Sequence, residues 1–78
     1  QILTDLEHFM RLAAENGDPG SQFNLAKVHI DRLPAESESY SAEDLENIRQ
    51  ARYWHRKAAA QGFQPSVDNL KLMEAFPE

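Results

Sequence analysis

Three histidines are the side chains of this sequence best suited to bind a metal ion or transfer a proton. His8, His29 and His55 lie far apart in the chain, and none has a second His or Cys at the spacing of zinc ligands. No Glu-x-x-His pair of the kind that holds a di-iron centre faces a common core. We therefore expect neither a metal ion nor a cofactor.

The serines do not form a pattern typical of nucleophilic catalysis. A serine nucleophile needs a nearby base and an oxyanion pocket, and the sequence indicates neither for Ser21 or Ser66. The chain contains no cysteine and no glycine-rich phosphate-binding loop. We interpret Ser21 and Ser66 as small residues where helices cross, and we expect a protein without enzymatic activity.

The element around which the rest is organised is the segment from Tyr53 to Gly62. An aromatic pair, a basic turn and three alanines precede a glycine, which predicts a helix that packs closely and ends at Gly62. A similar pattern ending at Gly17 lies 45 residues earlier. The alignment extends in both directions, matching Leu3 with Ile48, Leu6 with Ala51, Phe9 with Trp54, Ser21 with Ser66, Asn24 with Asn69, and Leu25 with Leu70. This predicts an internal repeat of helix, glycine turn and helix.

The repeated segments resemble the Sel-one-like repeat, a relative of the tetratricopeptide repeat. In that family one helix reads Ala-x-x-x-Leu-Gly-x-x-Tyr and the next reads Ala-x-x-Trp-x-x-Lys-Ala-Ala-x-x-Gly. Here the matching residues are Asp18-Pro19-Gly20-Ser21-Gln22-Phe23-Asn24-Leu25-Ala26 and, after a loop, Ala51, Trp54, Lys57-Ala58-Ala59 and Gly62. Ser21, Ala26 and His29 replace the family's alanine, glycine and tyrosine. The resemblance covers nearly the whole chain and implies an all-α solenoid, an α/α superhelix, in which His29 is a packing residue.

The chain of 78 residues is expected to form a single domain, 1–78, with helices at about 3–16, 19–32, 42–61 and 65–75. Asp18 and Pro19 are typical of a helix start, and Ser41 with Asp44 suggests a capping box. The short turn at Gly17 predicts an antiparallel pair of helices. Helix one resembles the second half of a repeat, so we expect an excerpt of a longer solenoid. The acidic, serine-rich loop from Ala35 to Ser41 is either a connection whose extra length the fold tolerates or a binding element.

Apolar spacing predicts which faces are buried. The expected buried residues are Leu3, Leu6, Phe9, Met10 and Ala13 in helix one; Phe23, Leu25, Ala26, Val28, His29 and Ile30 in helix two; Leu45, Ile48, Ala51, Arg52, His55, Ala58 and Ala59 in helix three, with Trp54 toward a flank; and Val67, Leu70 and Met73 in helix four.

The net charge of −5 argues against nucleic acid as a partner. Acidic residues precede basic ones along helix three, an order that complements the helix dipole and allows weak ion pairs such as Glu46 with Arg49. No segment approaches the roughly 20 apolar residues that span a bilayer, so we expect no membrane insertion. Neither charge nor cysteine content indicates a compartment.

The resemblance implies a protein-interaction scaffold whose concave face binds a peptide or a protein. In tetratricopeptide-like solenoids the first helix of each repeat lines that face, and the matching positions here are Phe23, Asn24, Lys27, Asp31, Asp68, Asn69 and Leu72. Asn24 and Asn69 occupy equivalent places, and an amide that donates and accepts can hold a peptide backbone.

Three alternatives stay open. The chain could self-associate through the exposed ends of the solenoid as a homo-oligomer. It could be a hydrolase, as some relatives of this family are reported to be, although the missing cysteine and nucleophile–base pair count against that. Trp54 with Tyr53 and Arg52 could form an interaction hot spot, or Trp54 could be the family's packing tryptophan.

Overall fold

The computed structural model describes residues 5–34 and 39–77, which form four α-helices and no β-strand. The helices are α1 (Asp5–Glu15), α2 (Pro19–Asp31), α3 (Ala42–Ala60) and α4 (Gln64–Leu72), and a short 3-10 helix, η1 (Met73–Ala75), follows α4. The all-helical prediction is confirmed, and the bounds agree closely with those expected. Leu3 and residues 35–38 of the acidic loop lie outside the described residues.

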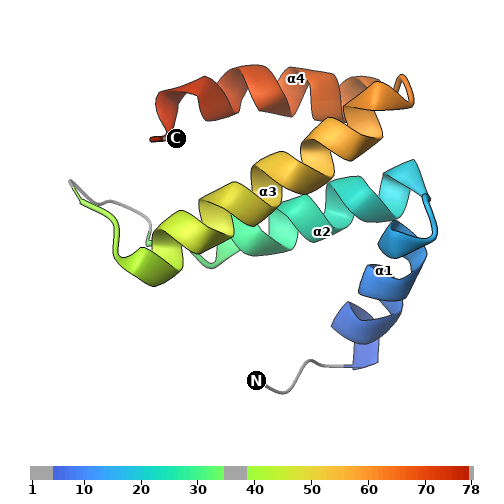
Figure 1. Cartoon of the computed structure of the whole chain (residues 1–78), viewed down its shortest axis with the longest axis horizontal. Helices are drawn as coiled ribbons and strands as arrows, with labels where there is room; N and C mark the ends of the chain where they lie inside the picture. The colour runs from blue at the N-terminus through green and yellow to red at the C-terminus, as the bar shows by residue number, and fades with distance from the viewer. Residues whose placement is uncertain (1–4, 35–38, 78) are drawn as a thin grey trace.

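Each helix packs against the next one in the sequence: α1 on α2, α2 on α3, and α3 on α4. Figure 1 shows α2, α3 and α4 lying side by side with the chain reversing at each turn, while α1 diverges from α2 toward its own N-terminus. The described part of the molecule is flat, with extents of 35 × 30 × 16 Å. A thin arrangement of this kind leaves large faces of α2, α3 and α4 open to solvent.

The two glycine turns have the same geometry. Gly17 and Gly62 both have a positive backbone angle φ, +99° and +83°, which residues with a Cβ atom rarely adopt. The N–H groups of Gly17 and Gly62 donate to the carbonyl oxygens three residues earlier, at 3.0 and 2.9 Å. The N–H groups of Asp18 and Phe63 donate to those five residues earlier, at 3.1 and 3.2 Å. This is the Schellman motif, and it forms at two positions that the alignment of the two halves pairs with each other.

The predicted starts of α2 and α3 are confirmed. The carboxylate of Asp18 accepts the N–H of Ser21 at 2.8 Å, and Pro19 occupies the first helical position. The hydrogen bonds that Ser21 donates lower the pKa of Asp18. Ser41 and Asp44 form a reciprocal capping box, in which each side chain accepts the backbone N–H of the other at 3.1 Å. Acidic residues therefore lie at the positive end of the dipoles of α2 and α3.

The core lies where α2 packs on α3 and consists mainly of small residues around one tryptophan. Ala26, Ala51 and Ala58 are fully buried, so the two helix backbones approach closely. Trp54 is 4% exposed, which corrects the prediction that it lies toward a flank. Helical spacing explains its place, because residues 47, 51, 54 and 58 share one face of α3. The other buried apolar residues are Ala14, Leu25, Ile48 and Met73.

Two of the predicted buried faces are wrong in part. Leu6 and Phe9 of α1 are 71% and 66% exposed, because α1 contributes to the core through Ala14 and Met10. On α3, Leu45 is 36% exposed, and Arg52 and Ala59 are half-buried. In the described residues, no helix combines the length and apolar character needed to cross a membrane.

Candidate functional site

A cleft of about 200 Å³ lies between α2 and α4, and we call it the α2–α4 cleft. Its wall on α2 is formed by Lys27, Ile30 and Asp31, and its opposite wall includes Asn69 and Leu72. The remaining lining residues are His55, Met73 and Phe76. Four of the seven residues predicted to bind a partner, Lys27, Asp31, Asn69 and Leu72, therefore meet in one cleft although they come from different halves of the chain.

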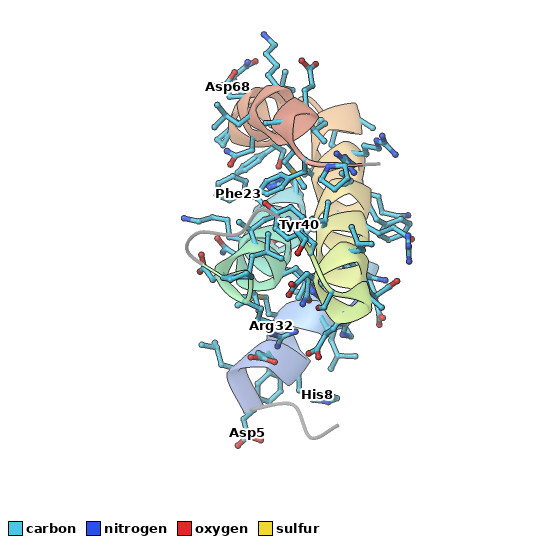
Figure 2. All side chains as sticks on the ribbon, turned by 90° about the vertical axis from the view of Figure 1, so that its left-hand side faces the viewer. Asp5, His8, Phe23, Arg32, Tyr40 and Asp68 are labelled. Atoms are coloured by element: carbon cyan, nitrogen blue, oxygen red, sulfur yellow. The ribbon has the colours of Figure 1, made fainter. Side chains whose placement is uncertain are left out.

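Phe23 organises one end of the region between the two helices. Its ring packs against His55 and Phe63, with centroid distances of 5.4 and 5.6 Å. The ammonium group of Lys27 lies 5.6 Å from the centroid of the same ring. Figure 2 shows Phe23 between α2 and α4. The aromatic contacts hold Phe23 in place, so it supports the cleft without lining it.

Asn69 lines the cleft, but its side chain already has an intramolecular partner. Its amide donates to the carbonyl oxygen of Pro65 at 2.8 Å, one turn earlier on α4. The amide oxygen makes no hydrogen bond within the described residues and can accept one from a ligand. Asn24 is exposed and does not line the cleft, and Asp68 accepts a hydrogen bond from Gln64 at 2.9 Å at the outer edge of α4 (Figure 2).

The fold brings His55 and Ser66 together, a pair that sequence reasoning did not find. His55 Nδ1 lies 3.1 Å from Ser66 Oγ, joining α3 to α4. Both residues are fully buried, at 1% and 0% exposure, and no carboxylate contacts the imidazole within the described residues. Burial lowers the pKa of His55. A substrate cannot reach this hydroxyl, so the pair joins two helices rather than forming an accessible nucleophile and base.

His29 and Asn47 form a second buried polar pair, between α2 and α3. His29 Nδ1 donates to Asn47 Oδ1 at 2.9 Å, while Nε2 of the same ring is buried with no partner among the described residues. The pKa of His29 is lowered, chiefly by burial, with Arg32 and Arg11 adding to the effect against the hydrogen bond to Asn47. The interpretation of His29 as a packing residue with a polar tip is confirmed.

Gln22 and Asn47 are buried polar residues that were not expected. Gln22 donates to the carbonyl oxygen of Ala14 at 3.0 Å and accepts from Gln61 at 3.1 Å, and Gln61 also donates to the carbonyl of Gly17 at 2.9 Å. The spacing of these residues along their helices could have predicted that they are buried. Residues 22, 25, 26 and 29 share one face of α2, and Asn47 shares the face of α3 that carries Trp54.

The described residues contain no group of three His, Asp or Glu side chains placed to hold a metal ion.

The residues of the possible interaction hot spot lie on different sides of α3. Trp54 is in the core, whereas Tyr53, 49% exposed, projects outward and packs edge-on against it. The packing interpretation of Trp54 is therefore correct.

Comparison of the chain with known protein families, with curated proteins and with solved structures found no match.

Proposed function

We propose that this chain is a protein-interaction scaffold whose α2–α4 cleft binds an extended peptide segment of a partner protein. The observation that carries the proposal is the convergence of Lys27, Asp31, Asn69 and Leu72 on one cleft with an apolar floor. The volume of about 200 Å³ is smaller than that of pockets for small-molecule ligands, ~300–1,000 Å³, which favours a single peptide side chain over a larger ligand. Lys27 and Asp31 stand at the rim, where they can contact the charged or polar groups of a peptide backbone and its neighbours.

The arrangement suits display better than catalysis. Helix α2 packs on α3 through the buried core, and α4 is joined to α3 by the buried pair of His55 and Ser66. The walls of the cleft are therefore preorganised. A preorganised surface loses little conformational entropy when a peptide binds. The matching glycine turns at Gly17 and Gly62, together with the resemblance to Sel-one-like repeats, favour a right-handed solenoid in which α2 and α4 are equivalent helices.

Selection of peptides from a random displayed library on the immobilised chain, followed by titration of the selected peptides, tests the proposal. Leu72→Glu places a charge in the cleft and is expected to weaken binding about tenfold or more, because the apolar side chain of the peptide loses its pocket. Asn69→Ala is expected to weaken binding about three- to tenfold. Leu6→Glu alters a leucine of almost the same exposure, 71% against 72%, on α1 and should have no effect. Equal losses with Leu6→Glu and Leu72→Glu would refute this site.

A second candidate function is self-association through α1. Leu6, Phe9 and Leu12 are 71%, 66% and 44% exposed and recur every third residue along this helix. Apolar side chains that gather on one exposed helix face are typical of a surface that another element covers. The occupant we consider here is a second copy of the chain.

Molar mass measured by light scattering over a concentration series separates the two functions. Self-association predicts a mass that rises with concentration and a Phe9→Glu variant that stays monomeric. The peptide-binding proposal predicts that Phe9→Glu keeps its affinity for the selected peptides. A wild-type chain that is monomeric at every concentration would eliminate self-association and leave peptide binding untouched.

A further inference from the structure

The outer face of α3 carries a second recess, distinct from the α2–α4 cleft. It has a volume of about 540 Å³ and runs along the side of α3 that faces away from the core; we call it the α3 outer groove. Residues 45, 49, 53 and 56 follow one stripe of the helix, and Arg52 and Lys57 flank it. From Leu45 to Lys57 the groove follows about 18 Å of helix.

The charge of this groove is opposite to that of the molecule. Arg49, Arg52, Arg56 and Lys57 are four of the eight Lys and Arg residues in a chain with a net charge of −5. Within the described residues, no Asp or Glu lines the groove. Figure 2 shows nitrogen-tipped side chains along the side of α3 that points away from Phe23. Basic residues concentrated in this way produce a local positive potential that attracts carboxylates.

The four cations are not equally free to bind a ligand. Arg52 donates to the backbone carbonyls of Met73, Phe76 and Pro77, at 3.0, 2.8 and 2.6 Å, and so supports the groove structurally. Arg49 pairs with Glu46 on the solvent side. Arg56 makes no ion pair or hydrogen bond within the described residues, which leaves its guanidinium free to bind.

Apolar surface lies between these charges. Tyr53 is 49% exposed and is held in place by Trp54, whose ring lies edge-on at 4.9 Å, and by Lys57, whose ammonium lies 5.3 Å from the Tyr53 centroid. Leu45, 36% exposed, extends the apolar surface toward the N-terminus of α3. Tyrosine and arginine are among the residue types enriched at the hot spots of protein interfaces.

We propose that the α3 outer groove binds an acidic segment of a partner protein, pairing its carboxylates with Arg56 and Lys57 and packing its apolar side chains against Tyr53 and Leu45. Charge complementarity identifies the occupant, because the groove is basic within an otherwise acidic chain. A nucleic acid fits less well. The apolar floor offers nothing to a phosphate backbone, and the net charge of −5 opposes it. This surface does not depend on the peptide-binding function of the α2–α4 cleft.

Fluorescence anisotropy with a labelled peptide of about 15 residues, long enough to follow the groove, tests this proposal. The probe repeats Glu-Glu-Leu-Leu; a second peptide carries Gln in place of every Glu, and an oligothymidylate of similar length represents nucleic acid. The acidic peptide is expected to bind more tightly than the other two probes, with an affinity that falls as salt is added. Equal binding of the Gln peptide, or tighter binding of the oligothymidylate, would overturn the proposal.

The matched pair of variants is Arg56→Glu and Lys71→Glu. Both reverse one exposed charge, but Lys71 lies on α4 outside the groove. Arg56→Glu is expected to weaken binding of the acidic peptide about tenfold, and Lys71→Glu less than about twofold. Circular dichroism of both variants checks that the helices are intact. An equal loss in the two variants would show that only the overall charge matters and would refute the groove as the site.

Discussion

His55 Nδ1 and Ser66 Oγ lie 3.1 Å apart in the fully buried contact between α3 and α4. The two residues come from opposite sides of the Gly62 turn, so their hydrogen bond fixes how the turn folds back. Arg52 provides a second link from α3, because it donates to the carbonyl oxygen of Met73, the C-cap of α4, at 3.0 Å. The pair of His55 and Ser66 and this contact of Arg52 together hold α4, and with it one wall of the α2–α4 cleft, against α3.

Ser66→Ala is expected to lower the free energy of unfolding by about 1–3 kcal/mol, because it leaves a buried ring nitrogen of His55 without a partner. Urea unfolding followed by circular dichroism measures the change. Ser21→Ala alters the serine 45 residues earlier, which is only half-buried, and should cost less than about 1 kcal/mol. A smaller loss for Ser66→Ala than for Ser21→Ala would contradict this role.

Stability is expected to fall in mild acid because two histidines are buried. Burial is the main cause that lowers the pKa of His29 and of His55 from the ordinary value of 6.5. Below about pH 6.5 the unfolded chain therefore binds protons that the folded chain excludes, so the free energy of unfolding decreases as the pH falls. The contribution of these two residues is fully present above that range and is lost on descending through it.

The measurement is urea unfolding at a series of pH values from about 7.5 to about 5. In the double variant with His29→Gln and His55→Gln the loss across this range should be clearly smaller than in the wild type. His8→Gln alters a histidine that is exposed on α1 and serves as the control. The explanation fails if the double variant and the control show the same pH dependence as the wild type.

The glycines are expected to respond in opposite directions to replacement by alanine. Gly62→Ala forces a Cβ into a positive φ of +83° and should cost about 1–2 kcal/mol, and Gly17→Ala at +99° should cost about the same. Gly20 lies inside α2, where an added Cβ would meet only an ordinary contact with Asp18 at 3.6 Å. Gly20→Ala should therefore stabilise by about 0.4–1 kcal/mol. Thermal unfolding of the three variants measures these effects, and a stabilising Gly62→Ala would disprove the strain argument.

Neighbouring aromatic residues on α3 are expected to differ sharply in their contribution to stability. Trp54→Ala removes the largest side chain of the core, which is 4% exposed, and should cost about 3–5 kcal/mol. Tyr53→Ala removes a side chain from a residue that is 49% exposed and should cost about 1 kcal/mol or less. Urea unfolding monitored at the helix signal distinguishes them. Similar costs for the two substitutions would mean that Trp54 is not the centre of the core.

The sequence by itself determined the elements that depend on local interactions. Gly17 and Gly62 end helices because they adopt a positive φ, and Asp18, Pro19, Ser41 and Asp44 begin them because their backbone and side-chain preferences act within one turn. Each of these signals involves residues no more than five positions apart. The four helices could therefore be located from one chain, without knowledge of how they pack.

The tertiary structure alone decided which faces those helices bury. The spacing of apolar residues predicted an apolar stripe on α1 and on α3. Whether a neighbouring helix covers such a stripe depends on how the helices pack against one another. In the folded chain Leu6 and Phe9 are exposed, whereas Trp54 lies in the core. The same applies to the pairs His29 with Asn47 and His55 with Ser66.

For the two candidate binding surfaces, too, the sequence predicted one part and the tertiary structure decided the rest. The resemblance to tetratricopeptide-like solenoids pointed to Lys27, Asp31, Asn69 and Leu72, and the packing of α4 against α3 brings these four to one cleft. The same packing leaves Asn24 and Asp68 outside it. The α3 outer groove required the folded chain, because Arg52 reaches Met73, Phe76 and Pro77 only after the C-terminal turn has packed beside it.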